Sequence, residues 1–219
     1  MSTTQLWQSM KLASTDAMVG NTDALSNLKS TPNGMILLHG PMGTGKTSLA
    51  LALCKERTGI ALEENQTVHN PGRVYASHVH ALDFDLGSAT EPKIFFYWRD
   101  PVFIIVDEAQ CLTKIRQQTR LKTMAPRPEL TLVFCTTDPQ QLDSAILDRC
   151  VKIRLGPLAA RELPELVKRA CAARGMAYDA EIVKALNRSA IFRPRAIIQA
   201  VDAIAAGKSI SEAVSGQAA

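Results

Sequence analysis

Short apolar runs alternate with longer helical patterns along the first 155 residues of the chain. Five runs have the length and composition of strands, at 35–38, roughly 74–82, 102–106, 130–136 and 151–155. Because strands that alternate with helices are typical of parallel sheets, the pattern predicts an α/β fold with a parallel five-stranded sheet flanked by helices. Residues 103–106, Phe-Ile-Ile-Val, are apolar without alternation, which predicts a central strand buried on both faces.

The strand pattern ends at Gly156-Pro157, and the sequence beyond it is helical in character. Three stretches have apolar residues at helical spacing: 159–173, 179–189 and 194–206. Asp179 can cap the second stretch, and Pro194 suits the first turn of the third. We therefore expect two domains and a tail. Their ranges are 1–156 for an α/β domain, 157–212 for a small all-α domain and 213–219 for a frayed tail.

Composition places few limits on the partners of this protein. A chain of 219 residues with 46% hydrophobic residues can bury a large core, so we expect a globular protein. The 25 Lys and Arg against 21 Asp and Glu give a formal net charge of +4, which alone does not establish an anionic partner.

Cysteine spacing and the length of the apolar runs bear on location. The five cysteines are scattered and never spaced C-x-x-C, which disfavours a disulfide framework and a zinc knuckle. No apolar run reaches the roughly 18 residues needed to cross a bilayer, and the polar N-terminus does not resemble a secretion signal. We therefore expect a cytoplasmic protein without a membrane partner.

A glycine-rich motif follows the first apolar run and precedes a helical stretch. Residues 40–47, Gly-Pro-Met-Gly-Thr-Gly-Lys-Thr, match the P-loop pattern G-x-x-x-x-G-K-[ST] in the context that it requires. The glycines let backbone N–H groups wrap phosphate oxygens, Lys46 can reach the β- and γ-phosphates, and Thr47 can ligate Mg²⁺. The motif predicts an ATP site formed by Pro41, Met42, Gly43, Thr44, Gly45, Lys46, Thr47 and Ser48.

Two acids follow the run at 102–106. Asp107 and Glu108 stand at the carboxyl end of a predicted buried strand, where ligand sites of α/β proteins lie. We assign Asp107, together with Thr47, to Mg²⁺, and Glu108 to activation of the attacking water. The two motifs together predict hydrolysis of ATP.

Six short motifs follow one another along the chain in an order that is informative when taken together. They are Val19-Gly20-Asn21, 40–49, Val106-Asp107-Glu108, 121–124 (Leu-Lys-Thr-Met), 135–142 (Cys-Thr-Thr-Asp-Pro-Gln-Gln-Leu) and 146–150 (Ile-Leu-Asp-Arg-Cys). In this order the sequence resembles the AAA+ ATPases, and within them the clamp-loader clade of bacterial DNA polymerase III tau/gamma and replication factor C subunits. The resemblance implies a P-loop AAA+ fold with a helical lid.

The resemblance also implies roles for residues near the γ-phosphate of ATP. Thr136 resembles the sensor 1 residue, which orients the attacking water or binds the γ-phosphate, and Thr137 is the alternative. Arg195, in the segment Arg-Pro-Arg-Ala, resembles the sensor 2 arginine that touches the γ-phosphate of its own subunit, and Arg193 is the alternative.

By the same resemblance, Val19 and Gly20 would lie against the adenine, and Arg149 would act on ATP bound to a neighbouring subunit. Arg149 resembles the arginine of a Ser-Arg-Cys motif, with Asp148 in place of the serine. A salt bridge between Asp148 and a nearby basic group is the alternative. The resemblance therefore implies a homo- or hetero-oligomer with ATP and Mg²⁺ at its subunit interfaces.

The chain departs from these subunits in several respects. No cysteines accompany His69, His78 and His80 in the manner of the tau/gamma zinc module, so we expect no structural zinc. The aromatic run at 91–98 suits either core packing or stacking with a nucleic-acid base. The Tyr-Arg-Pro stretch that often precedes the Val-Gly motif is missing here, and we expect no collar domain after the lid.

A basic segment after Glu108 bears on the partner. Lys114, Arg116 and Arg120 lie near one face of a predicted helix, which the resemblance places toward DNA and which would otherwise be a solvated face. We expect an ATP-driven loader or switch in DNA replication or another DNA transaction, with a client such as a sliding clamp. Three alternatives remain: a remodeller of a non-DNA client, a subunit that scarcely hydrolyses ATP, and a transposition- or phage-associated ATPase with the Asp-Glu-Ala-Gln motif of 107–110.

Overall fold

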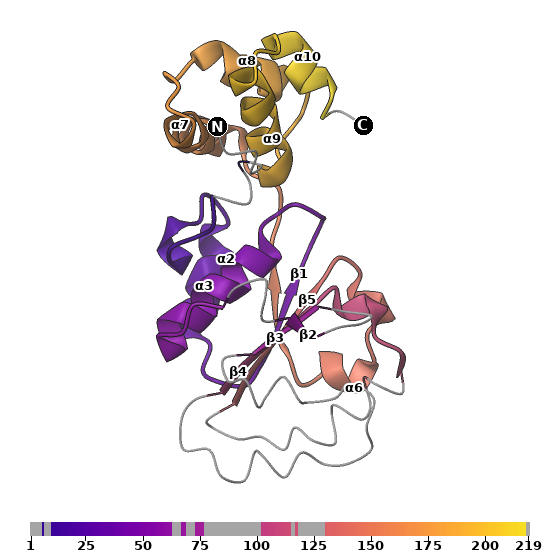
Figure 1. Ribbon diagram of the computed structural model, residues 1–219. Helices are drawn as coiled ribbons and strands as arrows, with labels where there is room; N and C mark the ends of the chain where they lie inside the picture. Colours follow the sequence, from indigo (N-terminus) through magenta and orange to yellow (C-terminus); the bar gives the residue numbers. More distant parts are fainter. Residues whose placement is uncertain are drawn as a thin grey trace.

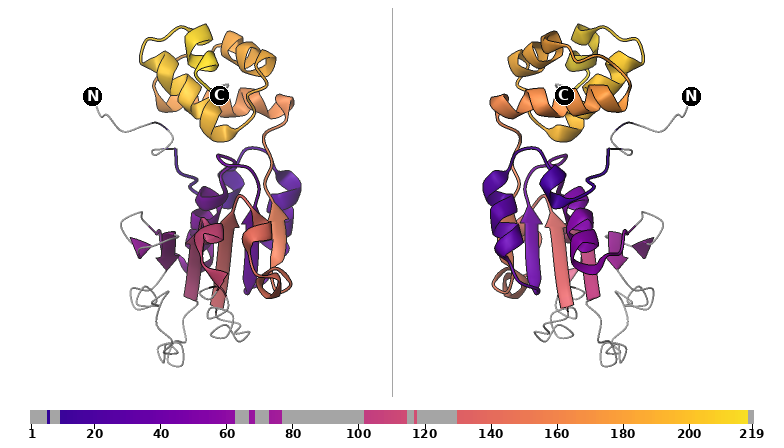
Figure 2. Two further views of the ribbon diagram at one scale, coloured as in Figure 1. Left: turned by 90° about the vertical axis from the view of Figure 1, so that its right-hand side faces the viewer. Right: turned by 90° about the vertical axis from the view of Figure 1, so that its left-hand side faces the viewer.

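The chain forms a sheet-containing part and a helical part that meet near Gly156 (Figure 1). The computed structural model describes residues 6, 10–62, 67–68, 73–76, 102–114, 117 and 130–217. The helical part lies beyond one end of the strands, as the two side views in Figure 2 show. Within the described residues, no helix has both the length and the apolar character needed to cross a membrane.

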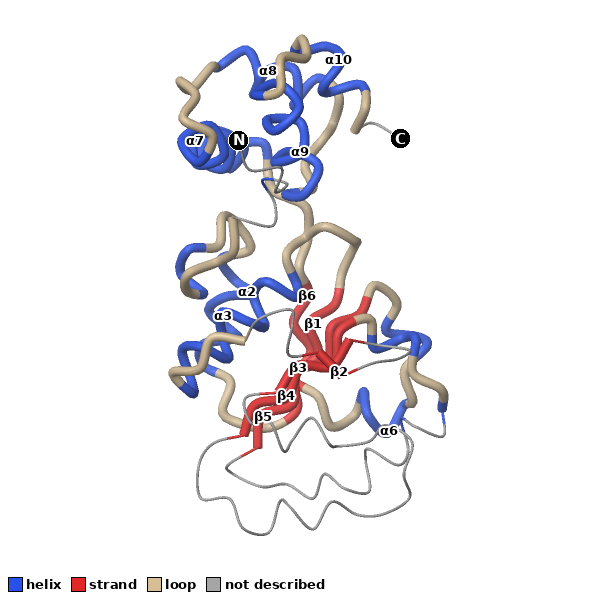
Figure 3. The backbone as a smooth tube through the Cα atoms, in the orientation of Figure 1, coloured by secondary structure: helices blue, strands red, loops and turns tan. Residues whose placement is uncertain are grey.

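Six strands form one sheet in the order β2-β3-β4-β5-β1-β6 (Figure 3). Their bounds are β1 Met35–His39, β2 Thr67–Val68, β3 Arg73–Ala76, β4 Val102–Asp107, β5 Leu130–Thr136 and β6 Val151–Arg154. Strands β4, β5, β1 and β6 are parallel, so their carboxyl ends meet at one edge. Because β5 lies between β4 and β1, the residues that follow Asp107 and Thr136 come close to the loop after His39.

The predicted α/β fold is confirmed, but four strands are parallel where the sequence predicted five. Strand β3, within the run predicted at 74–82, pairs antiparallel with β4, and β2 pairs antiparallel with β3. Either direction satisfies the same alternation of side chains between two faces. An apolar run therefore identifies a strand without giving its direction.

Helices cover both faces of the sheet. The first face carries α2 (Thr22–Ser30) and α3 (Lys46–Thr58), and the second carries η4 (Ala109–Cys111), η5 (Pro139–Gln141) and α6 (Ser144–Leu147). Successive residues of β1 alternate between these faces, since Ile36 and Leu38 are buried on the α3 side and Leu37 on the α6 side. Strand β5 is buried along its whole length, as expected for a strand inside the sheet.

The helical part, residues 157–217, has four α-helices where the sequence predicted three. Their bounds, after a short turn η6 (Ala160–Glu162), are α7 Leu163–Ala173, α8 Ala180–Arg188, α9 Pro194–Ala205 and α10 Ile210–Ser215. Asp179 caps α8 by accepting a hydrogen bond from the backbone N–H of Glu181 at 2.8 Å, and Pro194 begins α9, as predicted.

Helix α10 takes the place of part of the tail that the sequence predicted from residue 213. Its residues Ala213 and Val214 are buried, and it contacts α8 and α9. Ser209 and Glu212 form a reciprocal capping box at its start. A helix of six residues is too short to be stable alone, so packing against the other helices supplies the stability that periodicity does not reveal.

The segment before α2, which includes the turn η1 (Thr15–Ala17), joins the two parts. Leu6 is buried among the helices of the helical part, and Met18 is buried on the α3 side of the sheet. The backbone N–H of Gly156 donates to Oδ1 of Asn21 at 2.8 Å, and Nδ2 of Asn21 donates to the Gly156 carbonyl at 3.2 Å. Residues 19–21 therefore lie at the seam between the two parts.

Candidate functional site

Residues 40–45 form a tight loop between the end of β1 and the start of α3. The backbone φ angles of Gly40, Gly43 and Gly45 are 143°, 80° and 95°, a region that L side chains rarely adopt. A Cβ on Gly40 would lie 2.0 Å from the carbonyl oxygen of Leu155, so a side chain does not fit there. The loop thus passes closely over the end of β6 and turns directly into α3, whose first N–H groups are suited to an anion.

Lys46 is the first residue of α3 and is 7% exposed. Its Nζ donates hydrogen bonds to the carbonyl oxygens of Gly40 at 2.8 Å and Pro41 at 2.9 Å. Burial lowers the pKa of Lys46, whereas the nearby acids Glu108 and Asp107 act to raise it. An anion bound in the loop would offset the cost of burying this ammonium group, which makes the loop a suitable receptor for phosphate.

The other loop residues differ in exposure. Met42 is 60% exposed and Pro41 is exposed, whereas Thr44 is buried and its Oγ1 donates to the Pro41 carbonyl at 3.0 Å. Ser48 is half-buried in the first turn of α3. Since Thr44 and Lys46 both hold the carbonyl of Pro41, the loop keeps its curvature through side chains of its own residues.

Thr47 of α3 and Asp107 at the end of β4 are in direct contact. Thr47 Oγ1 donates to Asp107 Oδ1 at 2.9 Å, and the backbone N–H of Glu108 donates to the same oxygen at 3.1 Å. Hydroxyl and carboxylate oxygens are the ligands that Mg²⁺ prefers, with water and phosphate oxygens in the remaining positions. The pair therefore fits a Mg²⁺ ion, and the assignment stays a prediction.

Glu108 and Thr136 lie at the carboxyl ends of neighbouring strands, and Gln110 of η4 connects them. Gln110 Nε2 donates to Glu108 Oε2 at 2.5 Å and to Thr137 Oγ1 at 3.3 Å. The fully buried Thr136 donates from Oγ1 to Gln110 Oε1 at 2.7 Å. The sequence motifs assign no site role to Gln110, although its position two residues after Glu108 was an available signal.

The helical part contributes Arg195, near the start of α9. Its backbone N–H donates to the carbonyl of Gly43 at 3.2 Å. Burial is the main cause of the lowered pKa of Lys46, and the positive charge of Arg195 lowers it further. Gly20 lies at the seam, where a Cβ would meet a carboxylate oxygen of Glu162 at 2.6 Å. Both parts of the molecule thus contribute to the surroundings of the loop.

Val19, predicted beside the adenine, packs against the apolar cluster of the helical part, and Arg193 is exposed just before α9.

Arg149 lies away from this group, in the turn between α6 and β6. Because it precedes a parallel strand, it lies toward the amino ends of the strands, whereas the loop follows the carboxyl end of β1. Its side chain is exposed, and among the described residues neither Arg149 nor Asp148 takes part in a salt bridge. This position suits a contact with a second molecule better than a contact with the loop of its own chain.

The predicted basic face is described only at Lys114, which is exposed. Several predictions concern residues outside those that the structure describes: Arg116, Arg120, 121–124, the aromatic run 91–98, and His69, His78 and His80.

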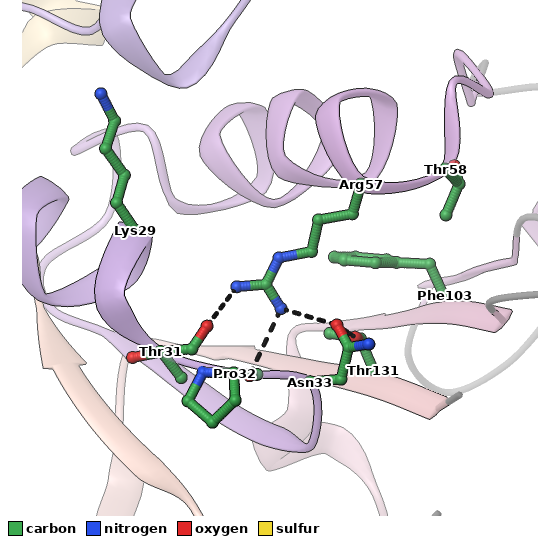
Figure 4. A pocket seen from close by; sticks show the side chains of 8 residues that line it. All are labelled: Lys29, Thr31, Pro32, Asn33, Arg57, Thr58, Phe103 and Thr131. Carbon is green, nitrogen blue, oxygen red and sulfur yellow. Dashed lines mark hydrogen bonds between the residues drawn. The ribbon is translucent and has the colours of Figure 1, made fainter. Parts of the chain in front are cut away.

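A hollow of about 300 Å³ lies near the opposite end of α3 (Figure 4). Phe103 and Thr131, close to the amino ends of β4 and β5, form part of its wall. Arg57 donates to the carbonyl of Thr31 at 2.7 Å and to Asn33 Oδ1 at 3.4 Å, and burial lowers its pKa. The eight residues around the hollow include no carboxylate. Arg57 therefore secures the connection between α2 and β1 and gives the hollow no acid–base group.

The model of the ATPase family associated with various cellular activities (AAA) matches residues 36–158 of this chain. The replication factor C large subunit of Methanosarcina mazei is 25% identical over 208 residues, which cover 90% of this chain and 33% of that protein. The DNA polymerase III subunit tau of Escherichia coli is 27% identical over 187 residues, which cover 78% of this chain and 29% of that protein. The chain thus spans about a third of the length of these curated relatives.

A solved structure of the Holliday junction branch migration motor RuvB from Thermotoga maritima has a similar fold. The TM-score is 0.64 at 17% identity, and the match covers 94% of this chain and 71% of that chain. At this identity the likeness concerns the fold alone. The family match is more specific, since it covers more than half of the chain and includes the loop, Asp107 and Glu108.

Proposed function

The chain belongs to the ATPase family associated with various cellular activities (AAA), and from this premise we propose that it is an oligomeric, clamp-loader-like ATPase acting in a DNA transaction. The observation that carries the proposal is the convergence of Lys46, the Thr47–Asp107 pair and Glu108 on one edge of the sheet. In the proposed cycle, ATP binding assembles subunits that grip DNA or a partner, and hydrolysis releases it.

The loop at 40–47 binds the phosphates of ATP. Lys46 exchanges its contacts with the carbonyls of Gly40 and Pro41 for phosphate oxygens, because an ammonium–phosphate hydrogen bond is stronger than a bond to a neutral carbonyl. The N–H groups at the start of α3 add further donors. A Mg²⁺ ion held by Thr47 and Asp107 would neutralise phosphate charge during hydrolysis.

Glu108 accepts the proton of the attacking water. Its side chain is exposed at the carboxyl edge of the sheet, where water has access, and its backbone φ of 50° turns the chain sharply away from β4. Thr136 holds the polar network beside it, and Arg195 approaches the γ-phosphate from the helical part. Val19 and Gly20, at the seam, would flank the adenine.

Arg149 acts on the ATP of a neighbouring subunit. It lies near the amino ends of the strands, whereas the loop of its own chain lies at their carboxyl ends. For this reason we assign Arg149 to an interface rather than to its own site. An arginine supplied from a second subunit stabilises the charge that develops on the phosphates in the transition state. Hydrolysis then depends on assembly.

The proposed partners are DNA and a protein client such as a sliding clamp. The names of the similar proteins, replication factor C and DNA polymerase III tau, support this choice, as does exposed Lys114 at the start of the basic segment. We also propose a cytoplasmic location.

Steady-state ATP turnover against protein concentration, with and without primer-template DNA at low salt, tests the proposal. We expect turnover per subunit to rise with concentration and to rise again with DNA. Arg149→Ala should bind ATP like the unmodified protein and lower turnover strongly, by about 10³-fold if it acts as arginine fingers do. Turnover that ignores both concentration and DNA would contradict the loader role and favour a remodeller of a non-DNA client.

A further inference from the structure

The side-chain amide of Gln110 contacts three residues at the carboxyl edge of the sheet. Its nitrogen lies 2.5 Å from the carboxylate of Glu108 and 3.3 Å from the hydroxyl of Thr137, and its oxygen lies 2.7 Å from the hydroxyl of Thr136. The amide therefore links the end of β4 to the end of β5 through side chains.

The carboxylate of Glu108 decides which way round this amide lies. Its oxygens only accept, so the amide nitrogen of Gln110 faces them and donates to Oε2 at 2.5 Å. The amide oxygen then faces Thr136, whose hydroxyl donates to it at 2.7 Å and accepts from the backbone N–H of Asp138 at 3.1 Å. Each donor in the chain from Thr136 to Glu108 meets an acceptor.

The turn η4 that carries Gln110 is itself well anchored. The backbone N–H of Cys111 donates to the carbonyl of Glu108 at 2.9 Å, and that of Leu112 to the carbonyl of Ala109 at 3.1 Å. Ala109 is fully buried, and Leu112 is 4% exposed. The amide is thus presented from a rigid base.

This geometry points to Gln110 as a positioning residue for ATP hydrolysis, an inference that rests on the proposed function. Glu108 is exposed and has a flexible side chain, so its carboxylate needs a restraint to face the attacking water. Gln110 supplies that restraint and couples Glu108 to Thr136, which is buried on a strand inside the sheet. A misplacement of about 1 Å at a reacting group can lower a rate by about 100-fold.

The test compares Gln110→Met, which keeps the length of the side chain and removes its hydrogen bonds, with Gln141→Met. Gln141 is the matched control because its amide donates to the carboxylate of the half-buried Asp138 at 2.9 Å, away from Glu108. At saturating protein concentration, Gln110→Met should lower kcat by about 10- to 100-fold and leave the Kd for ATP within about twofold. Gln141→Met should change neither value. Gln110→Glu, which keeps an acceptor for Thr136 but places an oxygen against Glu108, should be at least as impaired as Gln110→Met.

A double mutant separates positioning from a merely structural role. When Glu108→Gln is already present, adding Gln110→Met should lower the residual kcat by no more than about twofold, because the group that it positions is gone. A multiplicative loss, an unchanged kcat in Gln110→Met, or a raised kcat would each overturn the inference while the proposed function stands. ATP affinity that is equal in the unmodified protein and Lys46→Ala would instead overturn the proposed function, and the inference with it.

Discussion

Helix α3 has a partly buried cation near each end, Lys46 in its first turn and Arg57 in its last. Both side chains donate to backbone carbonyls of the segment next to β1: Lys46 to the loop that follows the strand, and Arg57 to the residues that precede it. Burial lowers the pKa of both groups. By charge, burial and hydrogen bonding the two ends of the helix look alike.

The surroundings of the two cations are different. Near Lys46 the chain adds a glycine loop that leads into the helix start, the Thr47–Asp107 pair, and Glu108. Near Arg57 it adds hydroxyl and amide side chains and no carboxylate around the hollow. A buried cation on carbonyls is therefore a structural clamp by itself, and it is the converging acids and N–H groups at the carboxyl edge that make a site.

The largest expected effect concerns Glu108, at the Lys46 end of the helix. Glu108→Gln should keep ATP affinity within about twofold and lower kcat by about 10²- to 10⁴-fold, because the amide cannot accept the proton of the attacking water. Titration calorimetry and single-turnover kinetics measure the two quantities. Turnover at the rate of the unmodified protein would remove Glu108 from the mechanism.

The next effect concerns the cation itself. Lys46→Ala should weaken ATP binding by about 10- to 100-fold, because it removes charge-assisted hydrogen bonds to the phosphates. We expect little loss of folding stability, since Thr44 still holds the Pro41 carbonyl. Calorimetry and thermal unfolding give both values, and an unchanged affinity would contradict the assignment of the loop to phosphate.

At the other end, Arg57→Ala should show the opposite pattern. The free energy of unfolding should fall by about 1–3 kcal/mol, because carbonyls between α2 and β1 lose their donor, while ATP affinity stays within about twofold. Lys55→Ala, at an exposed position on the same helix, serves as the control and should change stability by no more than about 0.5 kcal/mol. Reduced ATP affinity in a folded Arg57→Ala protein would break the distinction between the two ends.

The smallest effect concerns His39, the last residue of β1 before the loop. Burial, followed by the positive charges of Arg154, Lys152 and Lys46, lowers the pKa of His39 below 6.5. The unfolded chain then binds more protons than the folded one from about pH 6.5 downward, so this group lowers stability as the pH falls through that range. His39→Asn should flatten the pH dependence of the free energy of unfolding, measured with urea. Arg57→Ala should leave that pH dependence unchanged, because an arginine keeps its charge throughout this range. A steeper dependence in the variant would contradict this sign.

Much of the site could be predicted because its chemistry is local in sequence. The loop at 40–47 contains its glycines, its lysine and its hydroxyl within eight residues, and Asp107 and Glu108 are adjacent. Gln110 could not be assigned in the same way, because its function depends on Thr136, which is 26 residues away and becomes a neighbour only when β4 and β5 pair. The position of Arg149 relative to the loop likewise depends on the pairing of β6 with β1, a contact between distant segments.

The sequence by itself determined five of the six described strands, the first three helices of the helical part, where the strand pattern ends, and which motifs are suited to phosphate and Mg²⁺. These follow from side-chain periodicity and from groups close together in the chain. The tertiary structure alone decided the antiparallel direction of β3, the docking of α10, and the joining of Glu108, Gln110 and Thr136. The physical reason is the same in each case. Strand pairing and helix packing are contacts between distant segments, and their free energy belongs to the pair of surfaces rather than to either segment.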